Sequence, residues 1–419
     1  MAHKLAKKLV SVKPGTLFAG IDMALERNMA VLMTERAEVR TQFHFPNDRL
    51  GYDYLLRRLH ADQERYQAPT VLVGMEPTNY FWKLLAAELE RQSVPYRLVN
   101  PYTVKKHREG DNLDRSKDDP RDAFTIADLL RTGKFTETRL LHGRYAELRQ
   151  YAQSYDRLQQ ELRRQKNLIV NLAGQLFPEL GREFKDRTGQ TALALLRSSA
   201  AAGIIRQQAW PDFLAQVTAH FTGKGLAQAK LTRAYHLAAT SVGLTEGLEA
   251  LQWALASHIA TWELLQNQCA QVQTRLGDTF LAWPEAPYWL SVPGLGLVSA
   301  ALILAEIGDP HQYRQVDQWV KLAGTQPVPN TTGKKTRSLT PMSHQGRPRL
   351  RTVVYFAVLR LVQWDESFGR TYVHLQTRTP DPLTKMQALG VLMNKLLRIL
   401  WALGKQRRFY DPTWGLPAV

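Results

Sequence analysis

Short apolar runs alternate with helical segments near the start of the chain, and their order constrains the fold more than any other feature. Three strand-like runs come first, LFAGID, MAVLMT and VRTQFHF, and two more, TVLVGME and YRLVN, each follow a segment with helical spacing. Consecutive strands favour antiparallel pairing, whereas a strand that follows a crossover helix pairs in parallel. The order therefore predicts a mixed sheet with helices packed on it.

The remainder of the chain has a largely helical periodicity. Apolar side chains recur with heptad spacing over residues 148–172 and again over 248–276, which is a coiled-coil signal. The two runs are compatible with an antiparallel hairpin within one chain or with pairing between subunits. From residue 285, apolar helices flank a basic loop rich in Gly, Pro and Thr, so we expect this last part to be mostly α-helical.

A strong excess of positive charge points to a polyanionic partner. The 419 residues carry a formal net charge of +17, which favours DNA or RNA over a membrane surface. The single cysteine, Cys269, excludes an intramolecular disulfide and a cysteine-rich zinc site, and it fits a reducing cytosol. The longest apolar stretch, LGLVSAALILAEIG, is too short to cross a bilayer. We therefore expect a cytoplasmic protein that binds nucleic acid and no membrane.

Acidic residues crowd the start of one predicted helix, in SKDDPRDAFTIADLL. Asp119 can cap this helix, because Pro120 suits the first helical position, and Asp122 then resembles part of a capping box. The alternative is metal binding. Residues three apart share a helix face, the helix dipole keeps both carboxylates ionised, and Mg²⁺ prefers ionised oxygen ligands. Asp128, further along the helix, is expected to be a solvated surface acid.

Two further acids end predicted strands, Asp22 the first and Glu76 the fourth. If these strands pair, both carboxylates emerge at one sheet edge, and the helix that begins near Asp119 can close over it. Converging carboxylates repel unless cations neutralise them, and two Mg²⁺ about 4 Å apart are the usual arrangement for phosphoryl transfer. Separately, Asp22 is explained by a strand-end turn and Glu76 by simple exposure. Together they have the acid layout of a ribonuclease H-like nuclease.

Seven segments, in this order and spacing, resemble a known family. They are GIDMA, GMEPTNYFW, VNPYTVKKHRE, SKDDPRDAFTIADLL, SVPGLGLVSAALILAEIGD, WVKLAGTQPVPNTTGKK and MSHQGRPRLRTVVYFAV. They cover most of residues 17–132 and 285–362. The chain resembles the DEDD transposases of the IS110 insertion-sequence type, which include the Piv-like DNA invertases.

The resemblance, together with the periodicities, predicts an α/β plus α protein with four parts. These are a basic N-terminal tail at 1–16, a RuvC-like (ribonuclease H-like) DEDD catalytic domain at 17–144, a coiled-coil and helical insert at 145–284, and a mostly α-helical transposase domain at 285–419. The resemblance also implies a noncoding bridge RNA that pairs with donor and target DNA. It implies that Mg²⁺, as a pair of ions, is held by the family's four acids, which fall on Asp22, Glu76, Asp119 and Asp122.

One position departs from the family pattern. The family's serine nucleophile precedes a glycine in the basic loop, and here Thr332 occupies that place, in NTTGKK. Threonine also carries a hydroxyl that can act as a nucleophile, but its methyl group restricts χ1 and crowds the attacking oxygen. Ser343, in MSHQG, is the alternative nucleophile. Both hydroxyls have an ordinary explanation as turn caps or phosphate contacts.

Glycines and basic clusters supply the candidate nucleic-acid contacts. In PGLG, Gly294 and Gly296 resemble the turn of a helix-hairpin-helix motif, where backbone N–H groups approach a phosphate at the next helix start, although such a turn is also common without a ligand. A single basic residue is usually solvated, whereas a cluster suggests phosphate contacts. The basic candidates are Lys105, Lys106, His107, Arg108, Lys334, Lys335, Arg337, Arg347, Arg349 and Arg351.

Two other groups are less specific. On the first heptad run, the basic residues Arg157, Arg163, Arg164 and Lys166 are expected to contact RNA or only water. Tyr80, Phe81 and Trp82 are expected to be core residues rather than base-stacking ones.

We interpret the chain as an RNA-guided DNA transposase that is bacterial and nucleoid-associated. We expect it to work as a dimer or tetramer. Mg²⁺ positions the scissile phosphate, and the hydroxyl of Thr332 attacks it to give a covalent protein–DNA intermediate. One alternative is a RuvC-like junction nuclease that uses water. Another is a nucleic-acid-binding protein without catalysis on a transposase scaffold. The substitution of Thr332 for serine keeps both alternatives open.

Overall fold

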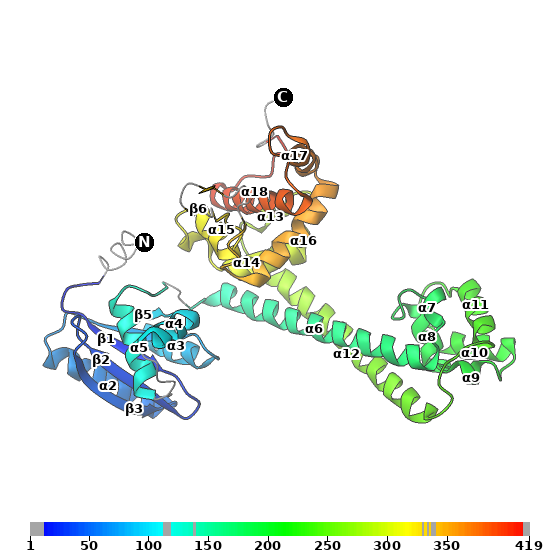
Figure 1. Cartoon of the computed structure of the whole chain (residues 1–419), viewed down its shortest axis with the longest axis horizontal. Helices are drawn as coiled ribbons and strands as arrows, with labels where there is room; N and C mark the ends of the chain where they lie inside the picture. Colours follow the sequence, from blue (N-terminus) through cyan, green and yellow to red (C-terminus); the bar gives the residue numbers. More distant parts are fainter. Residues whose placement is uncertain are drawn as a thin grey trace. The chain divides into compact units, whose positions relative to one another are not determined.

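The computed structural model describes residues 12–111, 119–136, 140–328, 331–332, 335–336 and 341–413 (Figure 1). At 108–111, 119, 331–332 and 335–336 it describes the backbone alone. The chain divides into two compact units, Met1–Leu141 and His142–Val419, and each is described by itself. The division into four parts stays a prediction.

A mixed five-stranded sheet forms the centre of the first unit, in the order β3-β2-β1-β4-β5. Its strands are β1 (Leu17–Asp22), β2 (Arg27–Met33), β3 (Val39–Pro46), β4 (Val71–Met75) and β5 (Tyr96–Leu98). The first three pair antiparallel, whereas β4 runs parallel to both β1 and β5. The mixed sheet predicted from the order of the apolar runs is therefore confirmed.

Helices cover both faces of this sheet, because its central strands are apolar on both sides. They are α2 (Arg49–Arg65), α3 (Phe81–Arg91), α4 (Pro101–Asp111) and α5 (Asp119–Arg131). Leu55 of α2 and Leu85 of α3 share one core with Ile21 of β1, whereas Ile126 of α5 shares the opposite core with Phe18. Phe18 and Ile21 lie in different cores because side chains alternate along a strand.

Two long helices, α6 (Gly143–Leu176) and α12 (Leu248–Leu281), pack along each other in the second unit (Figure 1). The amide of Gln159 donates to the Cys269 sulfur at 3.0 Å, and Gln165 meets His258 at 2.8 Å. Residues later in α6 thus pair with residues earlier in α12, so the helices run antiparallel. The heptad runs therefore meet within one chain, while pairing between subunits stays a prediction.

Five short helices form a lobe between α6 and α12 in sequence. They are α7 (Leu180–Glu183), α8 (Gln190–Ser198), α9 (Ala202–Ile205), α10 (Trp210–Ala219) and α11 (Gln228–Ala238). Their core contains the fully buried Phe177 and Phe213, and Ile169 of α6 and Ile259 of α12 belong to it. The lobe therefore closes one end of the long helix pair.

The last third of the chain folds into helices around a tryptophan-rich core. These helices are α13 (Ala286–Leu290), α14 (Leu297–Ile307), α15 (Asp317–Ala323), α16 (Pro348–Trp364), α17 (Glu366–Thr377) and α18 (Lys385–Gln406), with the one-turn helix η1 (Pro310–Gln312) and the small hairpin β6 (Thr331–Thr332) and β7 (Lys335–Thr336). Trp289 is fully buried and donates its indole N–H to the Leu400 carbonyl at 2.9 Å. Leu148 of α6 and Phe280 of α12 belong to the same core.

Among the described helices, α18 has the length and apolar composition of a membrane span. Leu392, Leu396 and Leu403 are fully buried in the core formed with α13 and α16, and half of its most apolar stretch is buried in this way. Its composition is therefore explained by its place at the centre of a helical domain.

Candidate metal site and nucleic-acid interface

The parallel register of β1 and β4 brings two acids to one edge of the sheet. Ile21 lies opposite Met75 in this register. Asp22 is the last residue of β1, Glu76 directly follows β4, and both side chains are half-buried. The two strands run in the same direction, so the acids leave the sheet side by side at its carboxyl edge.

Helix α5 packs directly on the glycines that precede these acids. A Cβ on Gly20 would lie 2.0 Å from the Ala123 carbonyl oxygen, and one on Gly74 would lie 2.4 Å from Leu130. Only glycine allows such a close approach of helix and strand. Strand residues two apart share a face, so Asp22 and Glu76 lie on the face that α5 covers.

The first turn of α5 lies towards the same edge. Ala123 clusters with Met29, the residue opposite Asp22 in β2. Later in the helix, Leu130 packs with Phe18, at the other end of β1. The helix therefore begins near the carboxyl edge, where the positive end of its dipole favours negative charge.

The first turn carries the other two predicted acids. Asp122 is half-buried, and the side chain of Asp119 lies outside the described part of the chain. Among the side chains that the structure describes, no three His, Cys, Asp or Glu residues lie close enough together to hold a metal ion. Asp22, Glu76 and Asp122 thus do not form a closed cluster by themselves, and the four-acid site stays a prediction. The candidate donors are all carboxylate oxygens, which suits Mg²⁺.

Asp128 is not the surface acid that the sequence suggested. It is 9% exposed, lies 2.9 Å from the His107 ring nitrogen and accepts from the Arg131 guanidinium at 2.9 Å. His107 belongs to α4, whereas Asp128 and Arg131 belong to α5. The contact between His107 and Asp128 ties the two helices together, so this carboxylate has a structural role.

Helix α4 also carries the basic candidates of the first unit. Lys105 and Lys106 are exposed, and the Lys106 ammonium lies 4.8 Å from the centroid of the Tyr102 ring. The side chain of Arg108 lies outside the described part of the chain. The contact of these three residues with nucleic acid stays a prediction.

The proposed nucleophile lies in a loop whose base is paired. The N–H groups of Val328, Ser343 and His344 donate to the carbonyls of Pro341, Gln326 and Gly324, respectively, at 2.9, 2.9 and 3.1 Å. Further out, Thr332 of β6 lies opposite Lys335 of β7. The side chains of both residues, together with Lys334 and Arg337, lie outside the described part. Ser343 belongs to the paired base, where it is half-buried.

Arg351 fastens the base of this loop. Its guanidinium donates to the carbonyls of Ala323 and, more weakly, His344, which lie on the two arms, at 3.0 and 3.5 Å. Gly324 has a φ of +68°, and a Cβ there would lie 2.8 Å from the Arg351 guanidinium. On α18, the amide of Asn394 donates to the Thr325 carbonyl at 3.2 Å. The base of the loop is thus held from two helices.

Three arginines surround one buried glutamate next to the same loop. Glu306 is 4% exposed, and its carboxylate lies 3.1 Å from Arg149, 3.8 Å from Arg349 and 4.0 Å from Arg347. Burial, together with the charge of Arg347, lowers the pKa of Arg149 to about 10. Arg347 and Arg349 therefore have internal partners that join α16 to α14 and α6, and their contact with phosphate stays a prediction.

Removing the glutamate charge should destabilise the second unit. Glu306→Gln leaves a buried guanidinium without its counter-ion, so we expect the free energy of unfolding to fall by about 3–5 kcal/mol. Urea unfolding followed by fluorescence of the buried tryptophans measures this. Glu366→Gln is the control, because Glu366 pairs with Arg370 on the surface and its side chain is 73% exposed. Equal stabilities of the two variants would contradict a structural role for Glu306.

The PGLG turn lies directly before α14. Gly294 has a φ of +86°, and a Cβ there would lie 3.1 Å from the side chain of Trp364, so glycine is required for the backbone and for the close approach. Gly296 is the N-cap residue of α14. The preceding helix, α13, has only five residues. The helix-hairpin-helix assignment therefore stays a prediction.

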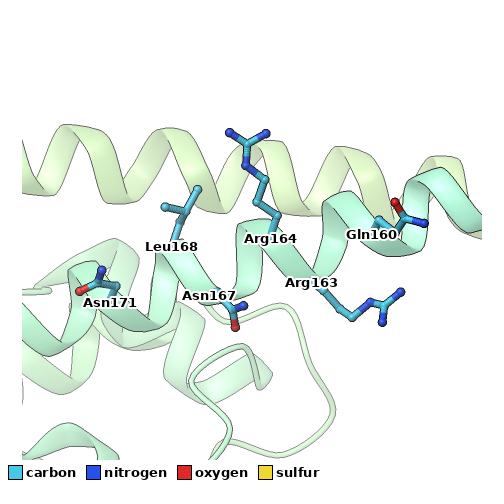
Figure 2. Close-up of a pocket in the computed structure, with 6 residues that line it drawn as sticks. All are labelled: Gln160, Arg163, Arg164, Asn167, Leu168 and Asn171. Carbon is cyan, nitrogen blue, oxygen red and sulfur yellow. The ribbon is translucent and has the colours of Figure 1, made fainter. Parts of the chain in front are cut away.

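Arginines and carboxamides line an open hollow of about 710 Å³ on α6 (Figure 2). Its residues are Gln160, Arg163, Arg164, Asn167, Leu168 and Asn171. Figure 2 shows the two guanidinium groups extending from the helix in different directions. The spacing of three to four residues places this set along a helix face. The sequence singled out the two arginines, but it gave no sign that the three amides would accompany them.

Sequence comparison defines the class of this protein. The DEDD transposase model of the IS110 type matches residues 19–178, which include Asp22, Glu76, Asp119 and Asp122. A second model, for the transposase IS116/IS110/IS902 family, matches residues 287–374, which include the loop with Thr332. These matches define a transposase of an insertion sequence. The chain belongs to the IS110 family of transposases.

Individual relatives agree with this assignment. The chain is 26% identical over 338 residues to the "Mini-circle putative transposase for IS117" of Streptomyces coelicolor, covering 76% of this chain and 78% of that protein. It is 26% identical over 364 residues to the "Probable family 20 transposase" of Pseudomonas aeruginosa, covering 85% and 90%. Similarity to the "Insertion element IS110 uncharacterized 43.6 kDa protein" of Streptomyces coelicolor is 22% over 298 residues, covering 71% and 72%.

Proposed function

We propose that this chain is a bridge-RNA-guided DNA transposase that cuts and rejoins donor and target DNA by Mg²⁺-dependent phosphoryl transfer. The observation that carries the proposal is the register of β1 with β4 under α5. It places Asp22 and Glu76 side by side at the edge towards which the first turn of α5 lies. Carboxylates at a helix N-terminus are a natural site for divalent cations that bind a phosphodiester.

The residues of the chain have distinct roles in this mechanism. Asp22, Glu76, Asp119 and Asp122 would hold Mg²⁺, which supplies charge neutralisation at the phosphate. The hydroxyl oxygen of Thr332 attacks phosphorus, so an oxygen–phosphorus bond forms while the bond from phosphorus to a deoxyribose oxygen breaks. The Thr332 hydroxyl gives up its proton in this step, and the released sugar oxygen takes one up, so protons balance. One phosphodiester thus replaces another, and the bond is kept for rejoining the strand.

Charge and surface chemistry support an RNA partner. The net charge of +17 suits a protein that grips nucleic-acid backbone while base pairing selects the sequence. The hollow on α6 offers guanidinium groups for phosphates, and its carboxamides can both donate to and accept from 2′-hydroxyl groups. We propose that structured noncoding RNA and double-stranded donor and target DNA are the partners. The active form would be a cytoplasmic dimer or tetramer.

Guided recognition is tested by comparing two RNAs of equal length. A structured RNA that co-purifies with the protein should bind more tightly than its scrambled sequence at the same salt concentration, because non-specific charge attraction acts on both equally. A gel-shift titration measures both affinities. Equal affinities would contradict RNA guidance.

Removing the two arginines of the hollow should weaken RNA binding. For Arg163→Gln combined with Arg164→Gln, we expect the slope of log affinity against log salt to become shallower by roughly 1.4 to 1.8, because two phosphate contacts are lost. The double variant Arg206→Gln with Arg275→Gln is the control, because both residues are exposed and lie outside the hollow. The same change in both double variants would show that only total charge matters.

The presence of Thr332 where the family has a serine favours a second candidate function, that of a RuvC-like junction nuclease. In that case water attacks the phosphodiester and no protein–DNA bond forms. A chain that binds nucleic acid without cutting it is the remaining alternative. Covalent trapping identifies the first function, because only the transposase leaves DNA attached to the protein, and a cleavage assay separates the nuclease from the chain that only binds.

A further inference from the structure

Two tyrosines lie exposed in the segments that follow β4 and β5. Tyr80 is 58% exposed and Tyr102 is 63% exposed, whereas Phe81, next to Tyr80, is 8% exposed and belongs to the core. The expectation that Tyr80 would be a core residue is therefore wrong, while it is correct for Phe81. Exposed aromatic side chains that gather near a candidate site indicate a binding surface.

Both tyrosines follow strands that end at the acid-bearing edge. β4 and β5 are parallel neighbours, with Met75 opposite Leu98. Glu76 directly follows β4 and Tyr80 comes four residues after it, and Tyr102 comes four residues after the end of β5. Segments that leave parallel strands at their carboxyl ends emerge on the same side of the sheet. The tyrosines therefore belong to the same edge as the carboxylates.

The backbone at each tyrosine is held in place. Tyr80 is the N-cap residue of α3, and its ring centroid lies 4.5 Å from that of Phe81. Tyr102 lies in the first turn of α4, where its N–H donates to the side chain of Asn100 at 2.9 Å, and the ammonium of Lys106 lies near its ring. Each ring thus has one supporting neighbour, and each tyrosine as a whole is still more than half exposed.

We propose that Tyr80 and Tyr102 form a stacking platform for the bases of an unpaired DNA strand, and that Lys105 and Lys106 contact its phosphates. Aromatic rings beside basic side chains are the elements that single-strand binding requires, and stacking tolerates any base sequence. The inference rests on the proposed function, because the carboxylates of the same edge are proposed to act on DNA. It adds a way to hold the strand, so that the scissile phosphate is presented to the acids.

Binding of single strands in the absence of metal tests the platform. Full-length protein in EDTA is titrated with a short single-stranded DNA that contains 2-aminopurine, whose fluorescence falls when it stacks. We expect Tyr80→Ala and Tyr102→Ala each to weaken binding about tenfold and to relieve the quenching, whereas both Phe variants behave as the parent. Val39→Ala and Trp253→Ala are controls, since these residues are 46% and 74% exposed, Val39 at the opposite end of the sheet and Trp253 in the second unit. Duplex DNA should bind all variants equally.

Three outcomes would overturn the platform. They are tyrosine variants that match the controls, Phe variants as weak as the Ala variants, or a loss confined to single-stranded RNA. Circular dichroism checks folding, and if Tyr80→Ala disturbs α3, Tyr102→Ala still decides the question. The proposed function is tested independently of the stacking platform. Asp122→Asn should bind the single strand with parental affinity, so normal cleavage by that variant refutes the metal role and leaves the stacking result intact.

Discussion

Asp122→Asn should abolish Mg²⁺-dependent DNA cleavage while leaving the fold intact. We expect a loss of at least about 10³-fold, which corresponds to roughly 4 kcal/mol of transition-state stabilisation, because the asparagine amide is a poor substitute for an ionised ligand. The cost to folding should be small. Loss of one carboxylate from the positive end of a helix is worth about 0.3–1 kcal/mol, and relief of repulsion from neighbouring acids offsets part of it.

Cleavage of a labelled donor duplex, with the cognate RNA and a series of Mg²⁺ concentrations, measures this effect. Asp53→Asn is the matched control, since it removes the same charge from α2, in the same unit, where Asp53 pairs with Arg49. Asp22→Asn and Glu76→Gln should resemble Asp122→Asn. Parental cleavage by Asp122→Asn, with a normal circular dichroism spectrum, would refute the metal role.

The sheet edge was largely predictable, because its placement depends on local patterns. Asp22 and Glu76 each end an apolar run, and the crossover through α2 makes parallel pairing of those runs the expected result. The structure adds the register of β1 with β4 and the close approach of α5 at Gly20 and Gly74. A glycine two residues before each acid was visible in the sequence. The structural role of these glycines could not be predicted, because it depends on which helix covers the strand.

Interactions between distant residues were not predictable from sequence. Asp128 looked like a surface acid because its partner His107 lies on another helix, 21 residues earlier. The partners of Glu306 come from α6 and α16, and no local pattern connects Arg149 with Arg347. Charge alone suggested nucleic acid for Arg347. The burial of Glu306 among these arginines shows that a basic cluster can also form internal ion pairs.

The heptad runs illustrate another limit. The spacing predicted that α6 and α12 each bury one stripe, but periodicity does not name the partner. The structure pairs the two runs through contacts such as Gln165 with His258, one of the polar interruptions of the pattern. The amides that accompany Arg163 and Arg164 on α6 were overlooked for a related reason. Polar residues on a helix surface carry no periodic signal of their own.

Thr332→Ala should abolish strand exchange while RNA and DNA binding persist. Without the hydroxyl no protein–DNA bond can form, so we expect a loss of more than about 10⁴-fold in joined product. Thr332→Ser should match or exceed the parental rate, because serine keeps the oxygen and lacks the methyl group that restricts χ1. Thr331→Ala is the matched control, since the neighbouring residue carries the same group in the same two-residue strand.

The decisive measurement stops the reaction under denaturing conditions and maps the DNA-linked peptide by mass spectrometry. We expect DNA to be covalently linked to Thr332 in the parent and to residue 332 in the serine variant. We expect no linked peptide in Thr332→Ala. Linkage at Ser343, which lies in the paired base of the loop, would transfer the nucleophile role to that residue. Cleavage without linkage at either residue would identify water as the nucleophile. In that case the sheet-edge carboxylates would belong to a junction nuclease, and the basic loop would only hold the strand.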